Sequence, residues 1–207
     1  MRGLFITLEG IDGCGKTTQA ERLAAYLSAQ GRQVVLTREP GGTVVSEKIR
    51  TLLLDRANCH MLWLTEMFLY MASRAQLTEE LIRPALKQGK VVISDRFMDA
   101  TLAYQGYGRG LDRELIRKLN AIATSHLAPD VTILVDLAPE ICGERMAAMQ
   151  KTVDRLEGSQ EEFHRRVREG YLEMARQEPG RFRVIDGTKP IDELEQQIRK
   201  FVHSLLQ

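Results

Sequence analysis

Residues 10 to 17 read Gly-Ile-Asp-Gly-Cys-Gly-Lys-Thr, a spacing of glycines, lysine and threonine that could bind a polyphosphate. The glycines permit tight turns, so successive backbone amides can point at phosphate oxygens from the start of a helix. Lys16 could then reach the terminal phosphates, and the Thr17 hydroxyl could hold Mg²⁺. The alternative is a glycine-rich turn that caps an ordinary helix. An apolar run before the loop and an amphipathic run after it favour phosphate binding.

A second apolar run, over residues 91–94, is followed directly by an acidic and a basic side chain, Asp95 and Arg96. A carboxylate at the carboxyl end of a buried parallel strand lies beside the ligand-binding edge of an open α/β sheet. Asp95 could therefore orient Mg²⁺, although an aspartate in this position can also cap a helix. Arg96 would be a costly isolated charge unless it met an anion, and a phosphate suits its planar guanidinium.

Residues 38–43, Arg-Glu-Pro-Gly-Gly-Thr, form another charged segment after a strand pattern. The proline and the glycine pair impose a fixed turn, which would hold Arg38 and Glu39 at the mouth of the sheet. Taken alone, the pattern slightly favours a surface loop with a solvated ion pair.

The elements that must position these side chains follow from the hydrophobic pattern. Short β-rich runs alternate with longer helical patterns, which predicts a three-layer α/β fold with a five-stranded parallel sheet flanked by helices. We predict strands near residues 4–9, 33–37, 90–94, 131–136 and 183–186. We predict helices near residues 16–30, 44–54, 61–87, 112–126, 139–150, 159–177 and 191–206. Pro84 interrupts the longest helical pattern, so we expect a kink near residue 83.

The chain of 207 residues is long enough for one domain with a sheet covered on both faces. Its formal net charge is +1, which predicts no general attraction to nucleic acid or to an anionic membrane. Three cysteines without a paired spacing argue against disulfides and structural zinc. No apolar stretch approaches the roughly 20 residues of a membrane span, and no signal-peptide pattern is present. We therefore expect a cytoplasmic protein without a nucleic-acid or membrane partner.

Taken in chain order, the motifs resemble those of the thymidylate kinases, nucleoside-monophosphate kinases with a P-loop. The resemblance runs from about residue 4 to residue 188, and the Arg-Glu-Pro-Gly-Gly and Asp-Arg-Phe motifs are its most specific parts. It implies transfer of the γ-phosphoryl group of ATP to dTMP, giving dTDP and ADP for dTTP synthesis, with Mg²⁺ as cofactor. It also implies a single P-loop kinase domain over residues 1–207 with a lid near 145–158, and a homodimer packed through the helix near 61–80.

The resemblance assigns roles residue by residue. The implied ATP-binding residues are Gly10, Ile11, Asp12, Gly13, Cys14, Gly15, Lys16, Thr17, Thr18 and Arg145. The implied dTMP-binding residues are Arg38, Glu39, Tyr70, Arg74, Arg96, Thr101, Tyr104 and Gln105. Those implied for catalysis are Lys16, Arg96, Arg155 and Asp12, and those for the metal are Thr17 and Asp95. In bound dTMP, the phosphate would be bound by Arg38 and Arg96, and O4 of thymine would be bound by Arg74. The N3 edge of the base would be read by Thr101 and Gln105, and the deoxyribose would lie against Tyr104.

Two features depart from the family pattern. Tyr70 stands where the family usually has a phenylalanine that stacks on thymine; a phenol ring still stacks, but its hydroxyl needs a partner or water. Family members without an arginine in the phosphate loop usually carry several in the lid, but here those lid positions hold Met146, Ala148 and Gln150. Candidates for the missing positive charge, in order of preference, are Arg155, Arg145 and Lys151.

Rival functions stay open at this point. Another nucleoside-monophosphate kinase would differ in its acceptor, and the depleted lid also suits a noncatalytic nucleotide-binding protein. A GTP-driven switch would use the same phosphate loop, but it predicts an Asn-Lys-x-Asp guanine reader, which the sequence lacks.

Cys14 has two interpretations as well. Its thiol would lie at a helix N-terminus near Lys16, and both features favour a reactive thiolate. The alternative is a small buried side chain that fills a tight loop.

Overall fold

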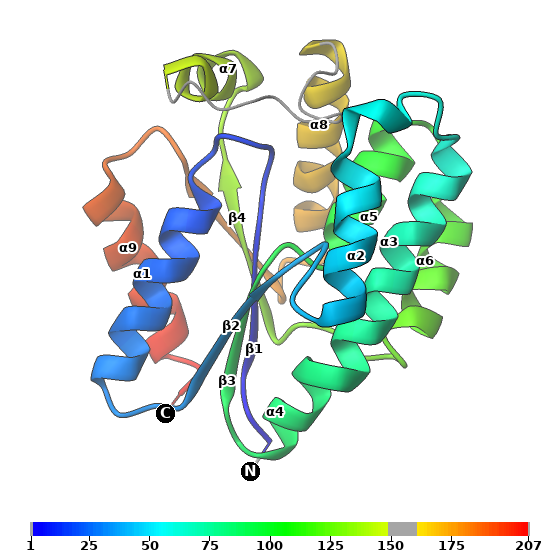
Figure 1. Ribbon diagram of the computed structural model, residues 1–207. Coiled ribbons are helices and arrows are strands. Elements are labelled where there is room, and N and C mark those ends of the chain that lie inside the picture. Colours follow the sequence, from blue (N-terminus) through cyan, green and yellow to red (C-terminus); the bar gives the residue numbers. More distant parts are fainter. Residues whose placement is uncertain (1, 149–160, 207) are drawn as a thin grey trace.

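A computed structural model describes residues 2–148 and 161–206 and shows one parallel sheet with helices on both faces (Figure 1). The sheet has five strands in the order β2-β3-β1-β4-β5. The strands are β1 (Phe5–Glu9), β2 (Val34–Arg38), β3 (Val91–Asp95), β4 (Val131–Asp136) and β5 (Phe182–Asp186). All five residues of the central strand β1 are buried, as expected for a parallel sheet covered on both sides. The predicted fold class is confirmed.

The helices form two layers (Figure 1). On one face α1 (Lys16–Ala29) packs beside α9 (Ile191–His203). The other face carries α2 (Val44–Leu54), the short 3₁₀ turn η1 (Arg56–Asn58), α3 (Trp63–Leu77), α4 (Arg83–Lys87), α5 (Met98–Thr101), α6 (Arg113–Ala123) and α8 (Glu161–Gln177). Helix α7 (Pro139–Ala148) lies across the edge where β4 ends. In the described part of the chain, no helix is both long and apolar enough to cross a bilayer.

The hydrophobic core fixes the central strands of the sheet below their carboxyl ends. Ile6 of β1 and Ile93 of β3 are completely buried and belong to one cluster with Leu23 of α1. Burying an aliphatic side chain of this size contributes about 1.5–3 kcal/mol relative to leaving it exposed. The carboxyl ends of β1 and β3, where the predicted functional residues follow, are therefore fixed relative to each other.

The longest helical pattern is interrupted close to the expected position. A π-helical segment, η2 (Thr78–Ile82), separates α3 from α4, and Pro84 follows it within the first turn of α4. Pro84 has no backbone N–H to donate to the preceding turn, and a wider turn accommodates the missing hydrogen bond.

A second π-helical segment, η3 (Leu102–Gly108), extends α5 where no helix was predicted. Its glycines lower helix propensity, but they also allow a very close approach to α8. A Cβ atom at Gly108 would lie 2.6 Å from the Phe163 ring, and one at Gly170 of α8 would lie 2.5 Å from the Tyr107 ring. Tertiary packing thus outweighs local propensity in the segment that carries Tyr104 and Gln105.

Candidate active site

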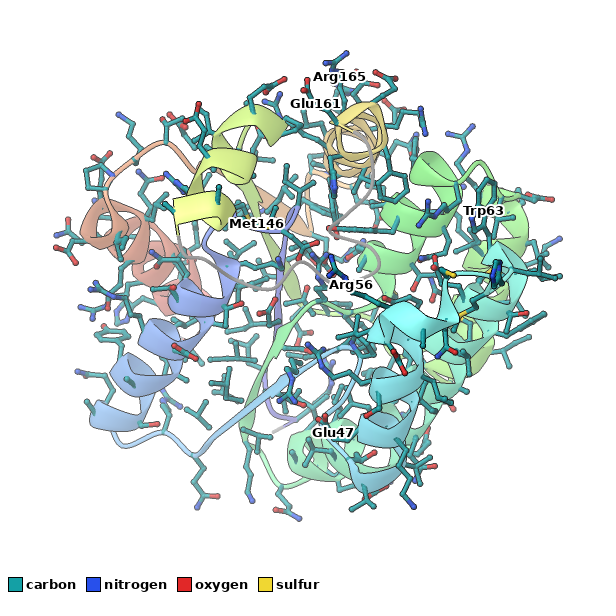
Figure 2. All side chains as sticks on the ribbon, turned by 45° about the horizontal axis from the view of Figure 1, so that its top comes forward. Glu47, Arg56, Trp63, Met146, Glu161 and Arg165 are labelled. Atoms are coloured by element: carbon teal, nitrogen blue, oxygen red, sulfur yellow. The ribbon has the colours of Figure 1, made fainter. Side chains whose placement is uncertain are left out.

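A cavity of about 270 Å³ opens at the carboxyl ends of β1 and β3. Figure 2 looks toward this end of the sheet, with Met146 of α7 on one side, Trp63 of α3 on the other and Glu161 of α8 at the top of the view. The wall is formed by Asp12, Lys16, Thr17, Arg38, Glu39, Pro40, Arg50, Leu54, Tyr70, Asp95, Arg96, Ala100, Thr101, Tyr104 and Gln105. The fold therefore brings most of the residues implied for dTMP binding and catalysis into one cavity.

The phosphate-binding loop connects β1 to α1 and packs closely against β4 and α7. Gly10, Gly13 and Gly15 all have positive φ angles, of 143°, 82° and 98°. A Cβ atom at Gly10 would lie 2.6 Å from the Val135 carbonyl oxygen, and one at Gly13 would lie 2.7 Å from that of Cys142. Glycine is thus required at these two positions by conformation and by space. Gly15 precedes α1, and no side chain in the described part of the chain caps this helix, which leaves the amides of its first turn available to an anion. Ile11, Cys14 and Thr18, also implied for ATP binding, belong to this loop and to the first turn of α1.

Asp12 and Arg96 meet on the cavity wall. Arg96 Nη2 donates to Asp12 Oδ1 and to the Tyr104 hydroxyl, both at 2.8 Å, and the same hydroxyl donates to Asp12 Oδ2 at 2.8 Å. Burial alone would raise the pKa of Asp12, but the charges of Arg96 and Lys16 hold it well below its usual range. Asp12 is therefore a carboxylate that orients two cations.

Behind the wall, Arg96 is held by two residues that sequence reasoning missed. Its Nη1 donates to the Tyr171 hydroxyl at 3.2 Å, and that hydroxyl donates to Glu9 Oε2 at 2.7 Å. Glu9 Oε1 accepts from the Phe97 backbone N–H at 2.7 Å. Burial and the nearby Asp99 raise the pKa of Glu9 to about 8. The acidic residue at the end of the buried strand β1 was the available signal for Glu9, whereas nothing local marked Tyr171 of α8.

Lys16, Thr17 and Asp95 lie side by side at the start of α1. Lys16 Nζ is 3.4 Å from the Ile11 carbonyl oxygen and 3.5 Å from Asp12 Oδ1, and these long contacts leave its ammonium able to bind a phosphate. The Thr17 hydroxyl donates to Asp95 Oδ2. Asp95 Oδ1 is buried and has no hydrogen-bond partner among the described residues. A hydroxyl and a carboxylate with one unsatisfied oxygen are suitable donors for Mg²⁺, which prefers oxygen ligands.

The opposite part of the wall is formed by Tyr70 of α3, Thr101 of α5 and Gln105 of η3. Thr101 Oγ1 is buried without a hydrogen-bond partner among residues 2–148 and 161–206. Gln105 Nε2 donates to Glu66 Oε1 at 2.7 Å. The unpaired Thr101 hydroxyl and the amide of Gln105 held by Glu66 can both read the edge of a ligand.

Arg74 does not reach the cavity wall, in contrast to its expected contact with thymine O4. The side chain is completely buried, and its Nε and Nη2 donate to Glu39 Oε2 at 2.9 and 2.5 Å. Nη1 donates to Asn120 Oδ1 at 2.7 Å, and Nη2 also donates to the Phe97 carbonyl oxygen at 3.0 Å. Glu39 offers a forked partner that satisfies a buried guanidinium, so Arg74 lies behind Glu39 and supports it.

The remaining cations are distributed around the site. Arg38 lines the wall and donates through Nη2 to Glu47 Oε1 at 2.9 Å. Arg50 of α2, which sequence reasoning missed, also lines the wall and donates to the Pro40 carbonyl oxygen at 2.8 Å. Arg145 of α7 is not part of the wall and donates to the Gly187 carbonyl oxygen at 3.1 Å.

The lid near 145–158 is described only up to Ala148. Arg155, which was the first choice for the missing lid charge, lies outside the described residues, as do Gln150 and Lys151.

Cys14 is a loop residue with no exposed surface, which favours its interpretation as a buried side chain that fills a tight loop. Burial raises the pKa of its thiol, and this effect outweighs the opposing charge of Lys16.

We expect iodoacetamide to modify the exposed Cys59 in the native protein while Cys14 stays unmodified, as peptide mass spectrometry would show. Denatured protein, in which both thiols should react, is the control. Native labelling of Cys14 as fast as Cys59 would contradict this assignment.

The fold and the site together define a class of protein. A phosphate-binding loop after the central strand of a 2-3-1-4-5 parallel sheet, beside a cavity lined by cations and polar side chains, is the arrangement of a P-loop kinase with a small acceptor.

Comparison with known proteins narrows this class. The family model for thymidylate kinase matches residues 8–198. The chain is 49% identical to a thymidylate kinase of Caldanaerobacter subterraneus over 206 residues, which are 100% of this chain and 98% of the relative. It is 51% identical to one of Deinococcus radiodurans over 197 residues, 95% of each chain. A crystal structure of thymidylate kinase from Ehrlichia chaffeensis has a TM-score of 0.80 and 38% identity, covering 98% of this chain and 99% of that chain. The chain belongs to the thymidylate kinase family and is an enzyme, a kinase of nucleotide biosynthesis.

Proposed function

We propose that this kinase transfers the γ-phosphoryl group of ATP to dTMP, giving dTDP and ADP, where the phosphate-binding loop meets the cavity. The observation that carries the proposal is the position of Asp12 between two cations. Its carboxylate contacts Lys16 of the phosphate-binding loop and Arg96 of the cavity wall. Phosphoryl transfer depends on in-line placement of two anions and on positive charge around the migrating group, and this pair of cations suits both needs.

On the donor side, the amides of the loop and the start of α1 bind the phosphates of ATP, and Lys16 reaches the β- and γ-phosphates. Thr17 and Asp95, which lie in hydrogen-bond contact, would hold Mg²⁺, and this ion would neutralise charge that develops on the phosphates. Thr18 and Arg145 complete the proposed ATP-binding set.

On the acceptor side, Arg96, Arg38 and the newly found Arg50 surround the phosphate of dTMP. Tyr104 lies against the deoxyribose and Tyr70 stacks on the base, whose N3 edge is read by Thr101 and Gln105. The attacking phosphate oxygen is already ionised near neutral pH, so no general base is needed.

A coupled ADP-release assay tests the proposal with dTMP, dUMP, dCMP, dGMP and dAMP as acceptors. We expect kcat/KM to be highest for dTMP and to require Mg²⁺. Equal turnover of a purine acceptor would favour another nucleoside-monophosphate kinase, and ADP release independent of any acceptor would exclude the proposed transfer.

We also propose that residues 1–207 act as one cytoplasmic domain that pairs as a homodimer through α3. The first turns of α3 carry several large apolar side chains that are about half exposed or more. They are Leu62, which is the N-cap residue of the helix, and Trp63, Leu64 and Phe68 within it. Such a patch is typical of an interface. Sedimentation velocity tests this proposal, since a mass that stayed at 23.5 kDa at all concentrations would rule it out.

A further inference from the structure

Glu66 of α3 is a completely buried carboxylate outside the cavity wall. Its Oε1 accepts a hydrogen bond from Nε2 of Gln105, which does line the wall, at 2.7 Å. Arg109 Nε lies 3.9 Å from the same carboxylate and supplies the compensating charge that a buried carboxylate needs. Glu66 is therefore well placed to act on a bound ligand through Gln105.

We propose that Glu66 is a positioning residue that decides which end of the Gln105 amide faces the bound base. The Glu66 carboxylate, which lies beside Arg109, accepts this hydrogen bond, so Gln105 must turn its NH₂ group toward Glu66. The amide oxygen of Gln105, at the other end of the same amide, is then left as the acceptor that this wall residue can present to the cavity. A reversed amide would set two acceptors against each other in a buried site.

A fixed acceptor at this position distinguishes pyrimidines by the chemistry of N3. Thymine and uracil carry an N3–H donor that an amide oxygen can accept, whereas cytosine carries a lone pair that it repels. The other polar atom nearby, Thr101 Oγ1, belongs to a hydroxyl that can rotate to donate or accept. Thr101 can thus adapt to either base, and the selection of a 4-oxo over a 4-amino pyrimidine depends on the orientation of Gln105.

Glu66→Gln tests the proposal, because a glutamine at this position can either accept or donate and so allows Gln105 to turn. We expect the ratio of kcat/KM for dTMP to that for dCMP to fall by about tenfold or more, with the KM for ATP unchanged. Glu80→Gln is the matched control, since Glu80 accepts an amide hydrogen bond from Gln76 at 2.6 Å but is exposed at the surface. This control should leave the ratio as in the wild type.

A second variant exchanges the two side chains, Glu66→Gln with Gln105→Glu. The carboxylate at position 105 is an acceptor in any orientation, so the exchange should restore the preference for dTMP over dCMP. A purely structural role of Glu66 predicts no such recovery. A ratio that stays at the wild-type value in Glu66→Gln, or stays low in the exchanged pair, would overturn the proposal.

The inference rests on the proposed reading of the base by Gln105, and Gln105→Leu separates the two ideas. An unchanged ratio in Gln105→Leu would show that the proposed role of Gln105 is wrong. A lowered ratio in Gln105→Leu together with an unchanged ratio in Glu66→Gln would contradict the positioning role alone. If Glu66 acts through Gln105, Glu66→Gln should not lower the ratio further in the Gln105→Leu background.

Discussion

Replacing Lys16 with alanine should lower kcat by about 10³-fold or more, with ATP and dTMP both still able to bind. Lys16 is 6% exposed and lies where the phosphate-binding loop joins α1. Burial and the repulsion of Arg96 would lower the pKa of Lys16, but Asp12 and the other nearby acidic groups raise it above its ordinary value overall. The ammonium therefore stays charged at neutral pH and can stabilise charge on the migrating phosphoryl group.

Steady-state kinetics and calorimetric titration of each nucleotide would separate turnover from binding for Lys16→Ala. Lys48→Ala is a suitable control, because Lys48 of α2 is exposed and does not line the cavity. A kcat within tenfold of the wild type, with a raised KM for ATP as the main effect, would mean that Lys16 contributes to ground-state binding instead.

The features that could be predicted from sequence are those with a local signal. Each strand lies within one residue of its predicted bounds, because a continuous apolar run between turns is typical of a buried parallel strand. The phosphate-binding loop has a local signal as well, since its glycines recur at a fixed spacing and take positive φ angles. The η3 segment was missed because its glycines weaken a helix in isolation, and the packing of Gly108 against Phe163 is a contact with a distant part of the chain.

The same reason explains the residues of the site that were missed. Tyr171 reaches Glu9 across 162 positions of sequence, and Gln105 reaches Glu66 across 39. Such partners have no fixed spacing, so a single sequence does not reveal them. The resemblance implied a role for Arg74, but it does not determine whether the Arg74 guanidinium faces the cavity or a carboxylate inside the protein.

Replacing Arg74 with methionine should lower the free energy of unfolding by about 3–5 kcal/mol, because it would leave the buried Glu39 carboxylate without its partner. The two side chains of this ion pair are 0% and 3% exposed, so the lost hydrogen bonds are largely shielded from water. Urea unfolding followed by circular dichroism measures the change. Arg176→Met is the surface control: Arg176 pairs with Glu173 at 2.9 Å, but both side chains are exposed, and its loss should change stability little.

The double variant Arg74→Met with Glu39→Gln decides whether the ion pair is the cause. Removing both charges leaves no unpaired buried ion, so the double variant should be more stable than Arg74→Met alone.

Steady-state kinetics of Arg74→Met, measured well below its melting temperature, then test the position of Arg74 behind the cavity wall. A wild-type unfolding free energy combined with a KM for dTMP that rises much more than the KM for ATP would contradict the structural role. That result would require Arg74 to leave Glu39 and contact the base when dTMP binds.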